Sequence, residues 1–229
     1  MVIGVIGGTG VLNLRLFGDS ERHIHLTKYG KVEVYHSGSI LFIQRHQYSR
    51  PPHMINHRGN ILVLKQLGAK NIISLCSTGS LKKAIKPGDI VIPNDYVQLS
   101  NIPTFYDNQL NFTTPSLSER LRKKIISAAK KTKVKLHTRG VYLQTTGPRL
   151  ETRAEVRFFK TFADVVGMTM ASEATLANEL QIEYAAICSV DNYANGIDSS
   201  LTNNKIERAK KKNFENIRSV LEKTLETIK

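Results

Sequence analysis

Short apolar segments alternate with longer amphipathic stretches along the whole 229-residue chain, and this alternation constrains the fold more than any other feature. A short apolar segment predicts a buried strand, whereas apolar residues spaced three or four apart predict a helix. Strands alternating with helices are typical of α/β domains. We therefore expect one α/β domain over residues 1–229, with a central mixed β-sheet flanked by helices. The expected strands are 2–6, 32–35, 40–44, 72–75, 90–92, 141–144, 165–167 and 184–188, and the expected helices are 54–68, 116–132, 151–162, 172–181 and 203–228.

Turn and cap residues support several of these boundaries. Gly38 and Ser39 separate two strands as a hairpin turn would. Gly68 is a helix-ending glycine, and Ser116 is an N-cap candidate. The two cysteines, Cys76 and Cys188, lie inside apolar segments, so we expect buried thiols rather than a disulfide or a metal site.

The chain is strongly basic, with 33 Lys and Arg against 19 Asp and Glu and a formal net charge of +14. This excess allows an anionic partner: nucleic acid, a membrane surface or a phosphorylated small molecule. Residues 120–139 carry nine of the basic side chains, which we interpret as the solvated face of an amphipathic helix. Tryptophan is absent and aromatic residues amount to 7%, so nucleic-acid binding is not favoured. No apolar run approaches a membrane span and no secretory leader is visible, so we expect a cytoplasmic protein.

A glycine-rich loop follows the first expected strand, at GVIGGTG over residues 4–10. Such glycines let backbone N–H groups approach an oxyanion, and the Thr9 hydroxyl adds a donor. The loop lacks the Gly-Lys-Ser/Thr of nucleotide triphosphatases and the glycine order of dinucleotide-binding proteins. By itself it is equally consistent with a tight turn.

Other anion donors follow other expected strands. Arg45 and His46 end one strand, Ser77 follows a second, and Thr169 follows a third. Arginine presents a fork of N–H groups that suits a phosphate. Because the carboxyl ends of parallel strands meet at one edge of a sheet, these residues together predict a phosphate site.

Five segments resemble, in collinear order, the trimeric purine nucleoside phosphorylase and methylthioadenosine phosphorylase family. The similarity extends from about residue 3 to about residue 197. The segments are GVIGGTG at 4–10, PPHMINHRGNILVLKQLGAKNII at 51–73, TGSLKKAIKPGDIVIPNDY at 78–96, TTGPRLETRAEVRFF at 145–159 and DVVGMTMASEATLA at 164–177.

This resemblance implies an enzyme, a pentosyltransferase in which phosphate attacks the anomeric carbon of a purine nucleoside. It also implies a homo-oligomer, trimeric or hexameric, with inorganic phosphate as co-substrate and no cofactor or metal. By resemblance, Glu151 accepts hydrogen bonds from the purine, although a glutamate at a helix N-terminus would also favour the helix dipole. The other positions carried over are Thr9, Arg45, His46, the backbone near Ser77 and Thr169 for phosphate, Met168 under the ribose, and Leu150 beside the base.

The end of the last expected strand selects the purine in this family. By alignment, Asn192 takes the selector position, and an amide suits a 6-oxopurine. Asp191, one residue earlier, would suit a 6-aminopurine instead. Successive strand residues face opposite sides, so both can face the base only across a bulge. We predict Glu151 and Asn192 as the catalytic residues and a 6-oxopurine substrate; a 6-aminopurine-specific methylthioadenosine phosphorylase is the alternative.

The pocket for the 5′ end of the sugar gives conflicting signals. Asn203 could donate to a 5′-hydroxyl, whereas Ile206 could pack on a methylthio group, so inosine, guanosine and 5′-methylthioinosine all remain candidates. Two departures from the family pattern affect the site: Cys76 replaces a hydroxyl or amide, and Leu150 replaces an aromatic residue. A family member that binds nucleosides without turnover and a basic nucleic-acid-binding protein are the further alternatives.

Overall fold

The computed structural model describes residues 1–8, 19–198 and 203–228, with the backbone only for residues 203–212. The described elements form one α/β domain around a sheet of eleven strands. The strands are β1 (Ile3–Gly7), β2 (Glu21–Thr27), β3 (Gly30–Ser37), β4 (Ile40–Gln44), β5 (Asn71–Ser80), β6 (Ile90–Val91), β7 (Asp95–Gln98), β8 (Leu136–His137), β9 (Val141–Gln144), β10 (Val165–Gly167) and β11 (Glu183–Tyr193). The helices are α1 (His57–Gln66), α2 (Glu119–Ala129), α3 (Arg153–Phe159), α4 (Met170–Glu179) and α5 (Asn203–Ile228).

The sheet is mixed, as the sequence predicts. Its main path runs β2-β3-β4-β1-β5-β10-β9-β7, and β11 pairs with β5 outside this path. The centre is parallel, because β1 pairs in parallel with β4 and β5, and β5 with β11. The hairpin β2–β3–β4 and the β5–β10 pair are antiparallel.

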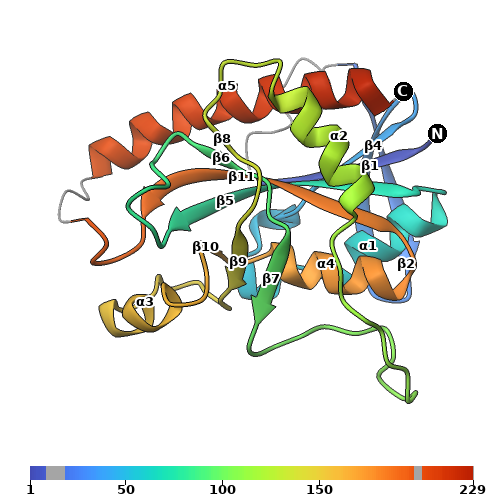
Figure 1. The fold of residues 1–229 in the computed structure, drawn as a ribbon. Coiled ribbons are helices and arrows are strands. Elements are labelled where there is room, and N and C mark those ends of the chain that lie inside the picture. The colour runs from blue at the N-terminus through green and yellow to red at the C-terminus, as the bar shows by residue number, and fades with distance from the viewer. Residues whose placement is uncertain (9–18, 199–202, 229) are drawn as a thin grey trace.

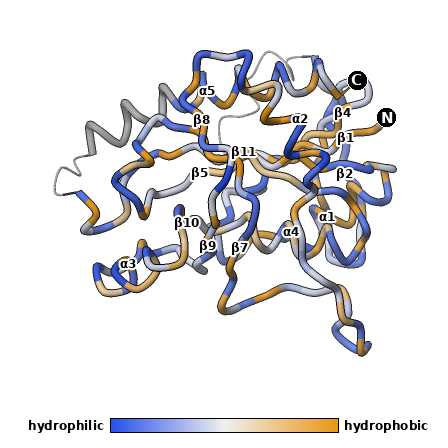
Figure 2. Tube along the Cα trace, viewed as in Figure 1, coloured by the Kyte–Doolittle hydropathy of each residue, from blue (hydrophilic) through white to orange (hydrophobic). Residues whose placement is uncertain are grey.

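Helices cover both faces of the sheet: α2 and α5 lie on one side, and α1 and α4 on the other (Figure 1). Alternation along β1 explains this. Ile3 and Val5 belong to a cluster with Leu121 and Leu221 of α2 and α5, whereas Ile6 packs with Leu64 of α1. Hydrophobic residues recur along the strands and on the helices of the Cα trace (Figure 2). Burial of these two layers is the main favourable term in folding the domain.

Most of the predicted elements are confirmed, with shifts at their ends. The strands over 40–44, 141–144 and 165–167 and the helix over 203–228 have the predicted bounds. The predicted turn at Gly38 joins β3 to β4, with a φ of 57°, and both cysteines are buried free thiols.

Three expectations are wrong. Ser118, and not Ser116, caps α2, because its hydroxyl accepts from the backbone N–H of Leu121 at 3.1 Å. Strands β2, β7 and β8 have no predicted counterpart. Arg122, in the stretch interpreted as a solvated face, is 2% exposed. Its guanidinium donates to the carbonyls of Pro93 and Thr138, so it fixes a neighbouring loop.

Two departures from a simple parallel sheet shape the site. Strand β10 runs antiparallel to the end of β5. The chain after Gly167 therefore continues toward the middle of β5, where Cys76 lies. The pairing of β11 with β5 shifts register between Val190 and Asn192, which leaves Asp191 in a β-bulge. No helix among the described residues is long and apolar enough to cross a membrane.

Candidate active site

Arg45 places its guanidinium inside the molecule, immediately after β4. The side chain is 3% exposed, and its backbone N–H donates to the carbonyl of Gly7 at 2.8 Å. The guanidinium donates to the carbonyl of Leu75 at 3.0 Å and to Ser74 Oγ at 2.7 Å. Three adjacent parallel strands, β4, β1 and β5, therefore fix this cation.

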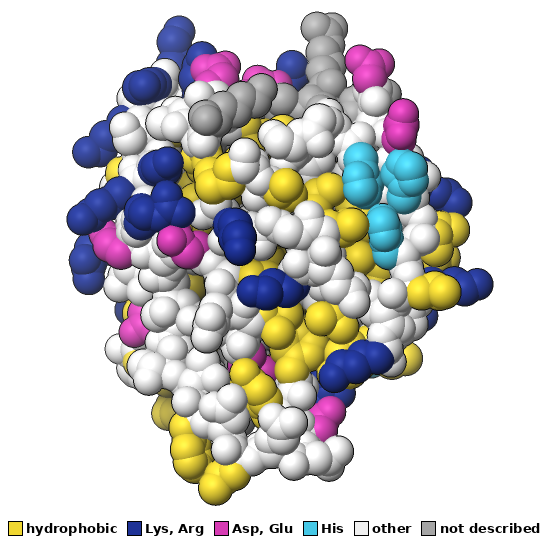
Figure 3. Space-filling model, turned by 90° about the vertical axis from the view of Figure 1, so that its right-hand side faces the viewer, with side chains coloured by type: hydrophobic (Ala, Val, Ile, Leu, Met, Phe, Trp, Pro, Cys, Tyr) yellow, Lys and Arg dark blue, Asp and Glu magenta, His cyan; other side chains and the backbone are white. Residues whose placement is uncertain are grey.

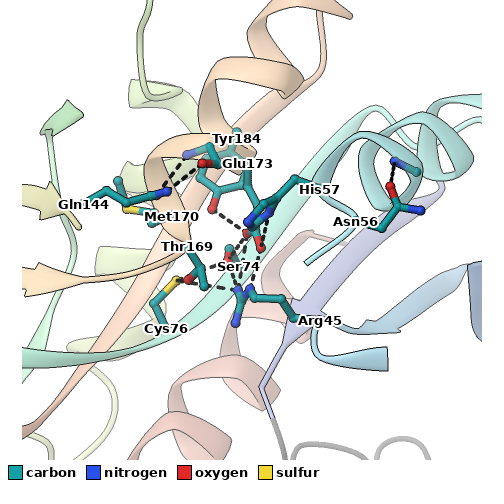
Figure 4. A network of polar contacts seen from close by, with 12 residues as sticks. Arg45, Asn56, His57, Ser74, Cys76, Gln144, Thr169, Met170, Glu173 and Tyr184 are labelled. Carbon is teal, nitrogen blue, oxygen red and sulfur yellow. Dashed lines mark hydrogen bonds and ion pairs between the residues drawn. The ribbon is translucent and has the colours of Figure 1, made fainter. Parts of the chain in front are cut away.

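Glu173 of α4 neutralises the buried arginine (Figure 4). Arg45 Nε donates to Oε1 at 2.5 Å and a terminal nitrogen to Oε2 at 3.3 Å, while the hydroxyls of Ser74 and Tyr184 donate to Oε2. Burial is the largest single influence on the pKa of Glu173 and favours the neutral carboxyl, but the charge and hydrogen bonds of Arg45, together with His57 and Ser74, hold the pKa below its usual value. Burial likewise opposes the charged guanidinium, and the charge and hydrogen bond of Glu173, together with Cys76 and Tyr184, raise the pKa of Arg45.

His57, the first residue of α1, contacts the same pair. Its Nδ1 lies 4.0 Å from Glu173 Oε1 and has no hydrogen-bond partner among the described residues. Burial lowers the pKa of His57 to about 4, and the charge of Glu173 offsets only part of this shift. The imidazole is therefore neutral at pH 7.

Thr169 and Cys76 complete what we call the phosphate-side cluster, consisting of Arg45, Cys76 and Thr169. The Cys76 sulfur lies 3.7 Å from a terminal nitrogen of Arg45 and 4.0 Å from Thr169 Oγ1. Thr169 is the N-cap of α4, yet its side chain makes no capping hydrogen bond. The antiparallel course of β10 brings this threonine back to the middle of β5, where Cys76 occupies the position that carries a polar side chain in the resembled family.

Two other predicted phosphate residues, His46 and Ser77, lie next to the cluster in sequence, and their side chains form hydrogen bonds with other parts of the protein. His46 Nδ1 donates to the carbonyl of Arg50 at 2.8 Å, which leaves Nε2 as the free ring nitrogen. Burial lowers the pKa of His46. The Ser77 hydroxyl donates to the carboxylate of Asp191. Thr9 lies outside the described residues.

A cavity of about 250 Å³ lies beside the end of β9 and the segment that joins it to α3, and we call it the base-side cavity. Glu151 is 7% exposed, and Thr145 Oγ1 donates to its Oε1 at 2.7 Å. Helix α3 begins after Glu151, because Thr152 is the N-cap and forms a capping box with Glu155. Glu151 directly precedes this N-cap, so the alternative interpretation, a carboxylate that favours the helix dipole, also fits its position. The cavity is lined by Leu99, Ser100, Leu143, Gln144, Thr145, Thr146, Gly147, Arg149, Glu151, Glu155 and Phe159.

The bulge in β11 gives Asp191 and Asn192 different surroundings. Asp191 is 7% exposed and accepts from Ser189 Oγ at 2.9 Å, from Asn213 Nδ2 at 2.6 Å and from Ser77. Its carboxylate is therefore committed to internal hydrogen bonds. The amide of Asn192 donates to the carbonyl of Tyr193 at 2.8 Å and lies beside Gly79 of β5.

The remaining predicted residues flank this region. Met168 packs against Gly147, where a Cβ would lie 2.5 Å from the methionine sulfur, and the φ of 68° at this position favours glycine. Leu150 is 68% exposed, which leaves its face free. The side chains of Asn203 and Ile206 lie outside the described part of the structure.

Comparison with known proteins identifies the family. The chain matches the Phosphorylase superfamily over residues 2–226. It belongs to that superfamily. It is 39% identical over 237 residues to a probable 6-oxopurine nucleoside phosphorylase of Archaeoglobus fulgidus, covering 100% of this chain and 96% of the relative. It is 40% identical over 210 residues to a probable S-methyl-5′-thioinosine phosphorylase of Methanocaldococcus jannaschii, covering 87% and 82%.

A solved structure shares the fold along the whole chain. A mutant adenosine/methylthioadenosine phosphorylase from Schistosoma mansoni, in complex with methylthioadenosine, superposes with a TM-score of 0.89 at 25% identity, covering 100% of this chain and 92% of the other. The predicted family and fold class are therefore confirmed. The individual site residues stay predictions, now with defined surroundings.

Three residues of the candidate site escape prediction from the sequence: Glu173, His57 and Ser74. Glu173 reads as one more polar residue on a helix, and Ser74 as a small residue in a buried strand. A signal does exist, since Arg45 follows a strand in which four of the five residues are buried, and a buried arginine requires an acidic partner. The packing of α4 against β5 and β11 decides which acidic residue becomes the partner of Arg45.

Proposed function

We propose that the protein catalyses phosphorolysis of 6-oxopurine nucleosides. A phosphate oxygen attacks the anomeric carbon, the bond from that carbon to the purine nitrogen breaks, and the base takes a proton as it leaves. The products are the free purine and a ribose 1-phosphate. Donors that face the departing base, where negative charge develops, stabilise the transition state more than the substrate.

The bulge at Asp191 carries the 6-oxopurine assignment. The Asp191 carboxylate already accepts from Ser189, Asn213 and Ser77, which leaves about one of its four acceptor positions for an exocyclic amine. Asn192 then supplies the selecting group, and its amide can donate to a 6-oxo group while its carbonyl accepts from the purine. Glu151 adds an acceptor for purine N–H groups from the base-side cavity.

The relatives support the same substrate class. The A. fulgidus and M. jannaschii proteins are named for 6-oxopurine and thioinosine substrates, at 39% and 40% identity. The S. mansoni enzyme, named for adenosine and methylthioadenosine, stands at 25%. A 6-aminopurine substrate is thus the weaker alternative. The 5′ substituent stays open between hydroxyl and methylthio, so inosine, guanosine and 5′-methylthioinosine are all candidate substrates.

Phosphate is the proposed co-substrate, held by the phosphate-side cluster with His46 and Thr9, and no cofactor takes part in the proposed reaction. Because Glu173 balances the charge of Arg45, the guanidinium serves as a fixed hydrogen-bond donor more than as a free cation. The contact of Arg45 with the Cys76 sulfur, at 3.7 Å, is longer than the other hydrogen bonds of its guanidinium, and it is the one that a phosphate oxygen would replace most readily.

We further propose a homo-oligomer, a trimer or hexamer, in the cytoplasm, acting in purine salvage. The segment after β7 supports association, because Leu99, Ile102, Leu110 and Phe112 expose between 56% and 89% of their surface. Exposed apolar side chains on one segment are typical of an interaction surface.

A substrate panel tests the proposed function. Inosine, guanosine, adenosine, 5′-methylthioinosine and methylthioadenosine are each incubated with and without phosphate, and base release is measured. We expect phosphate-dependent release from the 6-oxopurine nucleosides. Release from methylthioadenosine but from no 6-oxopurine nucleoside would overturn the substrate assignment, and release that is independent of phosphate would overturn phosphorolysis.

A further inference from the structure

Three histidines cluster on the hairpin of β2 and β3, away from the candidate active site. They are visible side by side on the molecular surface (Figure 3). His23 and His25 come from β2, and His36 comes from β3. The ring centroids lie 4.7 Å apart for His23 and His36, 5.5 Å for His25 and His36, and 6.4 Å for His23 and His25.

Strand alternation produces this grouping. His23 and His25 are two residues apart on β2, so they face the same side of the sheet. In the antiparallel pairing, Glu21 lies opposite His36 and His23 lies opposite Val34. His36 therefore faces the same side of the sheet as His23 and His25. The side chains of His25 and His36 then approach each other over the hairpin.

The distance between His25 and His36 matches a shared metal ion. Their Nε2 atoms are 3.4 Å apart, and the rings are nearly parallel, at 19°. Zn²⁺ binds imidazole nitrogen at about 2.0–2.1 Å with tetrahedral geometry, which separates two ligand nitrogens by about 3.3–3.4 Å. The two donors thus already stand at the spacing of a tetrahedral edge. A hydrogen bond between one protonated and one unprotonated nitrogen is the competing explanation.

A third imidazole, that of His23, lies nearby, but its Nε2 atom contacts a carboxylate and does not face the other two histidines. His23 Nε2 contacts Glu21 Oε2 at 3.3 Å, and the His23 side chain is 48% exposed. As placed, the described residues include no group of three or more donors that converge on one point. Because His23 is half exposed, rotation of its side chain toward His36 meets little packing resistance and would add a third ligand.

We propose that His25 and His36, joined by His23, bind a divalent transition-metal ion of the Zn²⁺ class. Imidazole ligands suit Zn²⁺, Cu²⁺ and Ni²⁺, whereas Mg²⁺ and Ca²⁺ take oxygen ligands. The ion would link β2, an edge strand of the sheet, to its neighbour β3. The site is structural and separate from the proposed phosphorolysis, whose described residues lie within β5 and β11 and after β4, β9 and β10.

Calorimetric titration of the untagged protein with ZnCl₂ in phosphate-free buffer tests the site, alongside thermal unfolding with and without Zn²⁺. We expect one ion per chain and a higher Tm with Zn²⁺. His25→Ala and His36→Ala should each weaken binding at least about 10-fold and abolish the Tm shift. His53→Ala, which removes an exposed histidine outside the cluster, should bind as the original protein does.

Cobalt reports the geometry directly. Co²⁺ in the same site should give the visible absorption of a tetrahedral complex, and His23→Ala should alter that spectrum while leaving weaker binding. If an alanine variant unfolds, His25→Phe keeps a ring without a donor nitrogen and tests the same point. Equal Zn²⁺ affinity in the original protein, His25→Ala and His36→Ala would overturn the proposal, as would the absence of binding with ZnCl₂ in several-fold excess over the protein. Binding of Mg²⁺ in place of Zn²⁺ would overturn the assigned metal class.

Discussion

The phosphate side and the base side of the candidate site are built in opposite ways. On the phosphate side, Arg45 and Glu173 are almost fully buried and satisfy each other through two hydrogen bonds. On the base side, Glu151 borders an open cavity together with Arg149 and Glu155, whose ion pair is exposed to solvent. One side is a rigid, dry charge pair; the other is a polar cavity with an exposed rim.

Under the proposed function, this difference corresponds to what each side would recognise. Phosphate is the same in every turnover, so its donors gain from being fixed before it arrives, because preorganised dipoles need no rearrangement during the reaction. Purines differ in their ring substituents, and a cavity whose wall carries a few polar groups can discriminate among them. Changes on the phosphate side should therefore affect folding and turnover together, whereas changes on the base side should affect substrate choice.

The largest expected effect comes from Glu173→Gln. This change leaves the buried Arg45 charge without its partner, so the free energy of unfolding should fall by about 3–5 kcal/mol. Urea unfolding followed by circular dichroism measures it. The matched control is Glu155→Gln, which removes an exposed ion pair with Arg149 and should change stability little. Equal losses in the two variants would contradict the contrast between the two sides.

The next effect is a pH dependence carried by His57. Its pKa is about 4 in the folded protein and about 6.5 when unfolded, so the unfolded chain takes up the proton first. The neutral imidazole therefore contributes about 3 kcal/mol to the free energy of unfolding above pH 6.5. This contribution is lost as the pH falls from about 6.5 toward 4. His57→Leu should remove this part of the acid sensitivity, whereas His53→Leu, at an exposed position, should retain it. Parallel stability curves for His57→Leu and the original protein would contradict the assignment.

On the base side, Glu151→Gln should reduce kcat/KM for inosine by about 10- to 100-fold, since one charge-assisted hydrogen bond to the purine is lost. Stability should change little, because the amide oxygen can still accept from Thr145. Steady-state kinetics with saturating phosphate measure the first effect and thermal unfolding the second. A large loss of stability with unchanged kcat/KM would reassign Glu151 to a purely structural role.

The smallest effect is a change of preference in Asn192→Asp. A carboxylate accepts from an exocyclic amine, so the ratio of kcat/KM for adenosine over inosine should rise by about 10-fold. The neighbouring Asp191→Asn is the matched control: it disturbs hydrogen bonds to Ser189 and Asn213, so it should lower stability and leave the preference unchanged. If Asp191→Asn shifts the preference and Asn192→Asp does not, the selecting residue is Asp191.

Where side-chain pattern and burial coincide, the sequence suffices to place the elements. Strand β4, with four of its five residues buried, has the predicted bounds, and so does α5. Strand β2 has no such signal, because ERHIHLT lies at the sheet edge with most of its residues exposed. Its pairing with β3 comes from backbone hydrogen bonds, which side-chain hydropathy does not report.

Local chemistry alone also misplaces residues whose partners are distant in sequence. Ser116 and Ser118 are equal N-cap candidates by type, and Ser118 serves because its hydroxyl also donates to Glu183, 65 residues away. Arg122 belongs to a strongly basic helix, and only the approach of the loop carbonyls of Pro93 and Thr138 explains its burial.

The sequence by itself determined the α/β class, the phosphorylase family and the residue types available for phosphate and purine, because these depend on local pattern and on motifs. The tertiary structure decided which of those residues meet. The bulge that commits Asp191 to Ser189 and the antiparallel turn of β10 that returns Thr169 to Cys76 depend on register between strands. Register depends on how side chains from distant segments pack against one another, and no single segment of the sequence contains that information.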